Sequence, residues 1–284
     1  MSMSYETGSS NITLNGVHYS YVDEGKGQTV LLLHGFTGTK KTWAELIKKL
    51  KQNFRVIAID LLGHGETDSP DDPDRYVMEK AAKDLDDFLT NNQIDRIHLL
   101  GYSMGGRLAL YFALNFQHRI RSMLLESCTA GLTSEDERLS RIKQDHQLAS
   151  MLLNKGIESF VEYWESIPLF SSQKKLSKSH QEKIRVGRLL QSPIGLSNSL
   201  KGMGTGNQPS LWDQLGTIEI RSLLICGEYD EKFCFIMGKM NEKFKNSEIK
   251  KIPRAGHAIH VEQSEIFATI VSEFFLKSEK EEMS

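Results

Sequence analysis

The sequence predicts an α/β fold with a mostly parallel central sheet and helices on both of its faces. Short continuous apolar runs, typical of strands buried on both faces, alternate with longer segments of helical spacing. This βαβ alternation is typical of a parallel sheet, and it stops once, between residues 130 and 206, where no apolar strand-like run is present. We therefore expect residues 1–129 and 207–284 to form one core and residues 130–206 to form an inserted helical cap.

The first half of the chain supplies most of the expected strands. Alternating residues around the turn signal Asn15-Gly16 predict a hairpin over 11–22, followed by a loop over 23–27. The expected buried strands that follow are 29–33, 55–60, 97–102 and 120–126. Helices are expected over 43–50 and 77–89 and from residue 104 to about 116, and a turn-rich loop over 61–70.

After the cap the same alternation resumes. We expect a strand over 222–226, a helix over 235–244, a short strand over 248–252 and a closing helix over 265–276. The charged tail 277–284 is expected to fray.

Composition excludes several function classes. The net charge of −2 over 284 residues gives no basic field for nucleic acid or for an anionic membrane. No apolar run approaches a membrane span, and the polar residues 1–10 lack the apolar stretch of a signal peptide. Three cysteines without framework spacing fit a reduced compartment. We therefore expect a cytoplasmic protein; the sequence sets no oligomeric state.

A glycine-flanked serine follows the expected strand 97–102, where a helix begins. The segment reads Gly101-Tyr102-Ser103-Met104-Gly105, a G-x-S-x-G pattern whose flanking glycines avoid a clash across the sharp turn. Such a turn exposes the serine hydroxyl and directs free backbone N–H groups toward whatever lies above it. The alternative interpretation is a serine that merely caps the helix.

Two further polar loops are expected at the same sheet edge as Ser103. Asp230 follows the strand 222–226, and His257 follows the strand 248–252. The order serine, aspartate, histidine is that of α/β-hydrolase triads, in which the imidazole takes the serine proton and the carboxylate orients the imidazole. We therefore predict Ser103, Asp230 and His257 as the catalytic residues.

For both predicted partners of Ser103, the sequence offers alternative residues that are nearby or of the same chemical type. His257 is preferred among the histidines because a glycine precedes it and it follows a strand directly. Asp230 is preferred among the acids because the turn places it just past the strand end. The alternatives to His257 are His64 and His260, and the alternatives to Asp230 are Glu228 and Glu231.

The loop His34-Gly35-Phe36 follows the expected strand 29–33 and is the candidate oxyanion hole. Its partner is the backbone N–H of Met104, the residue after the serine. One such donor contributes roughly a hundredfold or more in rate. The alternative is a tight turn with a structural histidine.

Arg107 lies one helical turn beyond Ser103 and shares its helix face. A guanidinium beside a nucleophile suits a substrate with carboxylates, which it binds in bidentate fashion. The expected cap adds Arg138, Arg141, Arg185 and Arg188. We therefore expect a small, multiply carboxylated substrate. No clustered His/Cys spacing indicates a metal, and no cofactor is expected.

The chain resembles the α/β-hydrolase superfamily over nearly its whole length. More narrowly, it resembles the 2-succinyl-6-hydroxy-2,4-cyclohexadiene-1-carboxylate synthases of menaquinone (vitamin K2) biosynthesis. The segments that carry this resemblance are Gly101-Tyr102-Ser103-Met104-Gly105-Gly106-Arg107, Gly227-Glu228-Tyr229-Asp230-Glu231-Lys232-Phe233 and Gly256-His257, with cap segments around Gly131-Leu132, Glu137-Arg138, Arg141, Phe160, Trp164, Pro168 and Arg188-Leu189-Leu190-Gln191-Ser192-Pro193.

The resemblance implies a carbon–oxygen lyase that removes a proton alpha to a succinyl ketone, whereupon pyruvate leaves from across the ring. It implies Ser103 as the base, activated by His257 and oriented by Asp230. It implies that the N–H groups of Phe36 and Met104 hold the enolate oxygen. The substrate-binding residues that it implies are Tyr102, Arg107, Arg141, Trp164 and Arg188.

Two other function classes stay open on the sequence. A serine esterase or carbon–carbon bond hydrolase acting on an anionic substrate would have the same triad but would form an acyl-enzyme or use activated water. A non-catalytic small-molecule receptor would also keep the fold. Whether Ser103 or His257 takes the substrate proton directly is likewise open.

Overall fold

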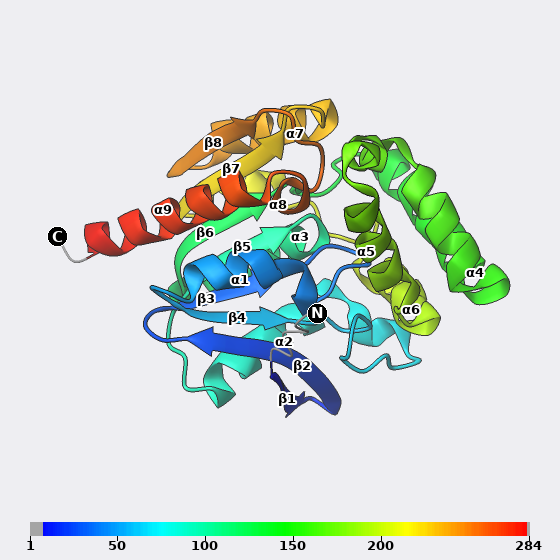
Figure 1. Cartoon of the computed structure of the whole chain (residues 1–284), viewed down its shortest axis with the longest axis horizontal. Coiled ribbons are helices and arrows are strands. Elements are labelled where there is room, and N and C mark those ends of the chain that lie inside the picture. The colour runs from blue at the N-terminus through cyan, green and yellow to red at the C-terminus, as the bar shows by residue number, and fades with distance from the viewer. Residues whose placement is uncertain (1–7, 283–284) are drawn as a thin grey trace.

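An eight-stranded sheet forms the centre of the computed structural model, which describes residues 8–282 (Figure 1). The strands are β1 (Ser9–Leu14), β2 (Val17–Gly25), β3 (Thr29–Leu33), β4 (Arg55–Ile59), β5 (Ile97–Tyr102), β6 (Ile120–Glu126), β7 (Arg221–Gly227) and β8 (Ser247–Ile252). Their spatial order is β1-β2-β4-β3-β5-β6-β7-β8. β1 and β2 pair antiparallel with their neighbours, and all later pairs are parallel. The predicted fold class is confirmed.

Alternate residues of each central strand point to opposite faces, and both faces are covered by helices. Val30 and Leu32 of β3 pack with α1 (Ala44–Leu50) and α9 (Ser264–Glu282). Leu31 and Leu33 of the same strand pack on the other face, with α2 (Met78–Asn91), α3 (Met104–Asn115) and α7 (Glu231–Lys243). A strand covered on both faces has no polar side, which explains its uninterrupted apolar run.

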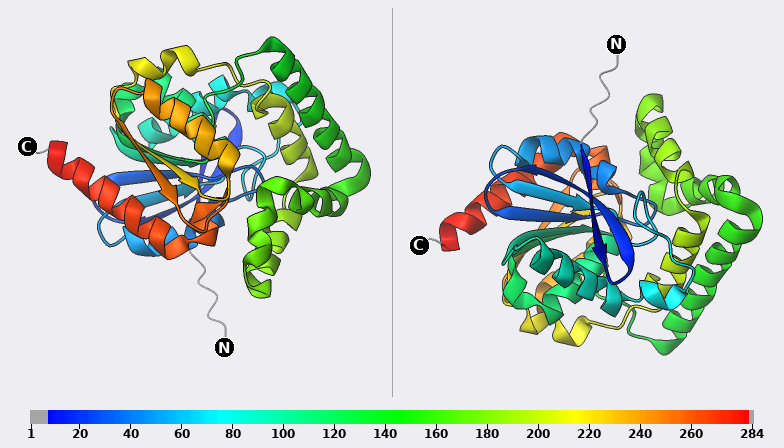
Figure 2. Two further views of the ribbon diagram at one scale, coloured as in Figure 1. Left: turned by 90° about the horizontal axis from the view of Figure 1, so that it is seen from above. Right: turned by 90° about the horizontal axis from the view of Figure 1, so that it is seen from below.

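The segment between β6 and β7 is helical, and no strand occurs within residues 130–206. It holds α4 (Glu135–Ser166), the 3-10 segment η4 (Pro168–Lys175), α5 (Lys178–Leu189) and α6 (Pro193–Met203). Gly156 (φ 80°) breaks α4 into two helices. Figures 1 and 2 show these helices gathered at one end of the sheet, outside the layers formed by the other helices.

The cap helices have a small apolar core that reaches the main one. Leu152 and Phe160 of α4 pack against Leu196 and Leu200 of α6. Phe36, in the loop after β3, packs against both this cluster and the main core. The cap therefore rests directly on the loop that was predicted to hold an oxyanion.

Three element boundaries differ from the sequence prediction by three residues or more. β2 continues to Gly25 through the expected loop, because residues 21–25 pair with β4. α7 begins at Glu231 rather than at residue 235, because the Asp230 side chain caps it. α9 continues to Glu282, so the described part of the tail does not fray; Glu281 there pairs with Arg221.

The predictions for the first residues and for the extreme tail extend beyond the described region, since residues 1–7 and 283–284 lie outside it. Within residues 8–282, no helix is long and apolar enough to cross a membrane.

A buried lysine fastens the loop after β4 to the sheet. Lys40, 1% exposed, donates from Nζ to Asp60 Oδ2 at 2.8 Å, to Glu66 Oε2 at 2.9 Å and to Ser20 Oγ at 2.9 Å. Hydrogen bonds from Lys40 and Lys41 lower the pKa of Glu66 to about 2. This network holds the loop that carries His64 at the carboxyl edge of the sheet.

We expect Asp60→Asn to lower the free energy of unfolding by about 3 kcal/mol, because the buried ammonium of Lys40 loses its buried carboxylate and keeps only the exposed Glu66 as an anionic partner. Urea unfolding checks this value. Glu45→Gln, which removes an exposed ion pair with Lys48, is the matched control and should change stability by less than about 0.5 kcal/mol. Equal urea midpoints for the two variants would contradict the structural role of the Lys40 network.

Candidate active site

The turn between β5 and α3 has the sharp geometry expected of a nucleophile. Ser103 has φ 50° and ψ −105°, a positive φ that non-glycine residues rarely adopt. Its N–H donates to Glu126 O at 2.8 Å, which ties the turn to β6. A Cβ on Gly101 would lie 2.4 Å from Gly105 O, and a Cβ on Gly105 would lie 2.3 Å from Leu33 O. Both glycines are therefore required by close backbone contacts.

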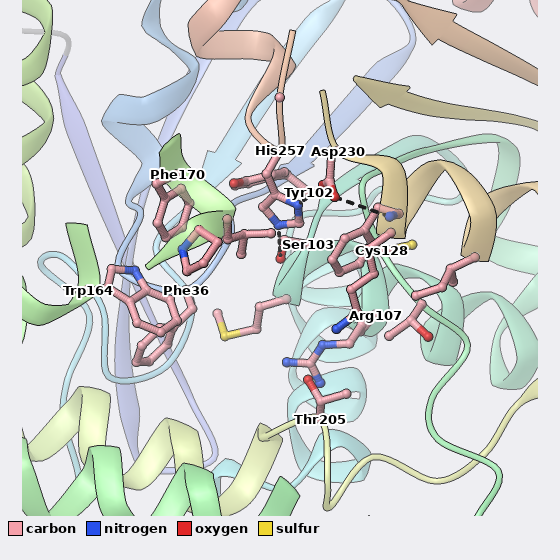
Figure 3. Close-up of a pocket in the computed structure, with 18 of the residues that line it drawn as sticks. Phe36, Tyr102, Ser103, Arg107, Cys128, Trp164, Phe170, Thr205, Asp230 and His257 are labelled. Atoms are coloured by element: carbon pink, nitrogen blue, oxygen red, sulfur yellow. Dashed lines mark hydrogen bonds and ion pairs between the residues drawn. The ribbon is translucent and has the colours of Figure 1, made fainter. Parts of the chain in front are cut away.

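The Ser103 side chain does not cap the helix that it precedes; it faces a histidine instead. No side-chain hydrogen bond caps α3. Ser103 Oγ lies 3.0 Å from His257 Nε2, and His257 Nδ1 lies 2.6 Å from Asp230 Oδ2 (Figure 3). Three side chains from distant parts of the chain thus form a continuous hydrogen-bonded series.

Asp230 is held by the helix that it begins. Its Oδ1 accepts the Phe233 N–H at 3.3 Å at the N-terminus of α7, while Oδ2 contacts His257. The positive end of the helix dipole favours a carboxylate at this position. Only 7% of Asp230 is exposed, so its charge is directed at the imidazole rather than at solvent.

The alternative candidates for the acid and histidine roles make other contacts. Glu228 accepts the Arg254 N–H, and Glu231 is exposed at the rim of the cavity. His260 lies beneath the site, with Nδ1 2.9 Å from the buried Glu126 carboxylate. His64 contacts Leu62 O through Nδ1 at 3.1 Å. None of these four residues bonds to Ser103 within the described part of the chain.

The loop after β3 offers an unused donor beside Ser103. Within residues 8–282, neither the Phe36 N–H nor the Met104 N–H donates a hydrogen bond. Leu61 N–H donates to His34 Nε2 at 2.9 Å, so the proton of this imidazole is on Nδ1, which lies 2.8 Å from Gly35 O. Burial lowers the pKa of His34 and keeps it neutral. A neutral histidine therefore fixes the backbone of the candidate oxyanion loop.

A cavity of about 480 Å³ opens above Ser103, between the core loops and the cap. Figure 3 shows Phe36, Trp164 and Phe170 on one side of Ser103 in this view and Arg107 on the other. The predicted site residues that line the cavity are Ser103, Asp230, His257, Phe36, Met104, Tyr102, Arg107, Arg141 and Trp164.

Arg107 presents a buried charge whose hydrogen-bond acceptors in the described chain are all neutral. It is 8% exposed, and its Nη1 donates to Met203 O at 2.7 Å and to Gln208 Oε1 at 3.3 Å, both neutral acceptors. Burial first, and then nearby Arg141, lowers the pKa of Arg107 to about 10, so it stays protonated at neutral pH. The cavity therefore has a cationic wall suited to a carboxylate.

The two predicted cap arginines differ in position. Arg141 lines the cavity, and its Nε donates to Asp145 at 2.8 Å. Arg188 is not among the lining residues: it lies over the Phe170 ring at 4.8 Å and contacts Glu165 at 3.3 Å. A role of Arg188 in binding carboxylate would require it to leave these contacts. Arg138 and Arg185, the other two arginines expected in the cap, do not line the cavity either.

Sequence reasoning missed several residues that surround the imidazole. The rings of Phe233 and Phe170 lie 4.6 Å and 6.2 Å from the His257 ring. Asp145 could have been found from its i,i+4 spacing to Arg141. No local rule indicates Glu262, whose carboxylate accepts the Gly256 N–H at 2.7 Å.

Within residues 8–282, no group of three or more His, Cys, Asp or Glu side chains could hold a metal ion.

Comparison with known proteins identifies relatives over almost the whole chain. The family model described as the alpha/beta hydrolase fold matches residues 28–264. A Bacillus subtilis protein, provisionally named as a 2-succinyl-6-hydroxy-2,4-cyclohexadiene-1-carboxylate synthase, is 48% identical over 270 residues, which cover 94% of this chain and 98% of the relative. The resemblance stated from the sequence is confirmed.

Two solved structures are also similar. MenH from S. aureus has a TM-score of 0.88 and 40% identity, covering 92% of this chain and 98% of its own. A malate-bound esterase from Thermogutta terrifontis has a TM-score of 0.85 and 28% identity, covering 95% and 98%. The chain is thus an enzyme of the α/β-hydrolase fold, and the receptor alternative is not supported.

Because His64 is buried, we expect the protein to lose stability as the pH falls. Burial, and then neighbouring His34, lowers the pKa of His64 to about 3. Between about pH 6.5 and pH 5 the unfolded chain takes up a proton on His64 that the folded chain does not, so the free energy of unfolding falls, by up to about 2 kcal/mol from this residue.

In His64→Gln this contribution is absent, so the difference in free energy of unfolding between wild type and variant should become smaller as the pH falls. Denaturant titrations at several pH values measure this difference. His146→Gln, at an exposed histidine, is the control and should run parallel to wild type. If the difference in free energy of unfolding between wild type and His64→Gln does not change with pH, His64 accepts a proton in the folded protein as readily as in the unfolded chain.

Proposed function

The chain belongs to the α/β-hydrolase fold family and, within it, to the 2-succinyl-6-hydroxy-2,4-cyclohexadiene-1-carboxylate synthases, and from this premise we propose that it is a pyruvate-eliminating lyase. Its substrate is 2-succinyl-5-enolpyruvyl-6-hydroxy-3-cyclohexene-1-carboxylate, an intermediate on the route to menaquinone. The reaction breaks one carbon–hydrogen and one carbon–oxygen bond, and needs no oxidant, metal or added water. We place it in the cytoplasm, in keeping with the free thiols of Cys128, Cys226 and Cys234.

Proton removal is assigned to the hydrogen-bonded series at the bottom of the cavity. Ser103 Oγ takes the proton alpha to the succinyl ketone while its own proton passes to His257 Nε2, 3.0 Å away. Asp230, 2.6 Å from Nδ1, orients the imidazole and stabilises the imidazolium. The electron pair released at carbon moves onto the ketone oxygen, which becomes an enolate.

The enolate oxygen is assigned to the unused N–H groups of Phe36 and Met104. Donors fixed before the reaction need no reorganisation as charge develops on the oxygen. The enolate then returns its electrons through the ring double bond and expels the enolpyruvyl oxygen. The proton held by His257 is available to the departing group, which leaves as pyruvate.

The observation that carries this proposal is the buried charge of Arg107, from which no described carboxylate accepts a hydrogen bond. A buried guanidinium whose described acceptors are neutral favours a substrate that brings its own carboxylate into the cavity. Arg141 also lines the cavity and pairs with Asp145, so two guanidinium groups lie near a single carboxylate. A neutral ester would leave Arg107 unpaired, whereas the proposed substrate carries a ring carboxylate, a succinyl carboxylate and an enolpyruvyl carboxylate.

The same triad also supports a second candidate, a hydrolase of anionic esters. The contact between Ser103 and His257 is equally suited to nucleophilic attack, and an esterase is among the similar structures. The two reactions differ in product, because only the lyase releases pyruvate from the enolpyruvyl substrate.

A coupled pyruvate assay on the enolpyruvyl substrate tests the assignment. We expect rapid pyruvate release by wild type and a loss of at least about a thousandfold in kcat for Ser103→Ala, since the base is removed. Neutral nitrophenyl esters should be turned over slowly. Strong ester hydrolysis without pyruvate formation would favour the hydrolase instead.

We expect Arg107→Ala to lower kcat/KM about a hundredfold, because a charge-assisted contact to a buried carboxylate contributes about 1.5–3 kcal/mol. The same pyruvate assay measures the effect. Arg185→Ala is the matched control, since Arg185 pairs with Glu165 outside the cavity, and it should retain near wild-type kcat/KM. Equal effects of the two variants would remove Arg107 from the carboxylate site.

A further inference from the structure

One carboxylate joins the catalytic histidine loop to the cap. Glu262, at the end of α8 (Ile259–Glu262), accepts the Gly256 N–H through Oε2 at 2.7 Å. Its other oxygen, Oε1, accepts the Ser172 hydroxyl of η4 at 3.0 Å. The peptide before His257 and the cap segment η4 are therefore bound to the same side chain.

A steric contact brings the two segments together independently of these hydrogen bonds. A Cβ on Gly256 would lie 2.1 Å from Ser172 Oγ and 2.8 Å from Ser172 Cβ. Only a glycine lets η4 approach the histidine loop this closely. The contact is thus specified by residues on both sides, and Glu262 adds a polar connection to a close steric fit.

The η4 segment also forms part of the cavity wall beside the imidazole. Leu169 and Phe170 line the cavity with Ser172, and the Phe170 ring lies 6.2 Å from that of His257. Arg188 packs over the Phe170 ring at 4.8 Å and contacts Gln173 at 3.3 Å. A shift of η4 would therefore change both the shape of the cavity and the packing of the imidazole.

We propose that Glu262 is a positioning residue: its two carboxylate oxygens fix the position of the His257 loop relative to the η4 wall of the cavity. One oxygen fixes the peptide that precedes the catalytic imidazole, and the other fixes the wall against which the substrate binds. The reaction by which this role is measured rests on the proposed lyase function, whereas the geometry of the two contacts does not.

The test combines steady-state pyruvate release with crystal structures of three variants. Glu262→Ala removes both contacts and should lower kcat about ten- to hundredfold, because hydrogen bonds to charged groups are lost beside the imidazole. Ser172→Ala removes only the contact with η4 and should raise KM about fivefold with little change in kcat. Glu262→Gln is the conservative variant: its amide oxygen accepts from Gly256 and its NH₂ reaches Ser172, so near wild-type kinetics should return.

The crystal structures give a readout that does not depend on the substrate. In Glu262→Ala we expect His257 Nε2 to lie beyond hydrogen-bonding distance of Ser103 Oγ, whereas Glu262→Gln should keep the 3.0 Å contact. If wild type releases no pyruvate, the proposed function fails, but these structures still test the role of Glu262.

The positioning role is overturned if Glu262→Ala keeps wild-type kcat and an unmoved imidazole. Should Glu262→Ala fail to fold, Ser172→Ala decides: an unchanged KM would show that the contact between Glu262 and η4 does not shape the cavity. Failure of Glu262→Gln to restore kcat in a folded protein would equally reject positioning by these two hydrogen bonds.

Discussion

The positive φ of Ser103 is the constraint on which the rest of the site depends. A residue in this conformation is strained, and it persists only where its surroundings determine it. Here Gly105 packs on the backbone of β3, Gly101 packs on Gly105, and the Ser103 N–H is tied to β6. The strands β3, β5 and β6 thus fix the position of the Ser103 hydroxyl above the sheet edge. The loop after β8 then brings His257 to this hydroxyl.

Burial gives the charges at this edge their effect. Arg107 and Asp230 are both buried away from bulk water, where their fields would be screened. Asp230 is compensated by an imidazole and a helix N-terminus, whereas the described acceptors of Arg107 are neutral carbonyl oxygens. This asymmetry fits the two proposed roles, in which Asp230 orients the imidazole of His257 and Arg107 binds a carboxylate of the substrate.

Features set by short sequence segments were predictable, and those set by distant contacts were not. The run 29–33 and the glycines around Ser103 carry local signals, so the sheet and the sharp turn could be foreseen. The contacts of Arg188 are with Glu165, Gln173 and Phe170, on two other elements, and no spacing rule connects them. The extension of α9 likewise depends on tertiary contacts, since its charged end meets Arg221 of β7.

The triad by itself does not decide between proton removal and nucleophilic attack. A serine, histidine and aspartate in this arrangement serve either reaction, as the similarity of this chain both to MenH and to an esterase illustrates. The choice depends on which substrate atom lies above Ser103 Oγ, and the walls of the cavity determine that position. Arg107 lies on the helix that begins just after the serine, so a carboxylate bound there would bring carbon atoms a fixed distance from it within reach of the hydroxyl. In the proposed lyase, specificity for elimination therefore rests on the cationic wall and the cap, while the proposed triad supplies a base that many substrates could use.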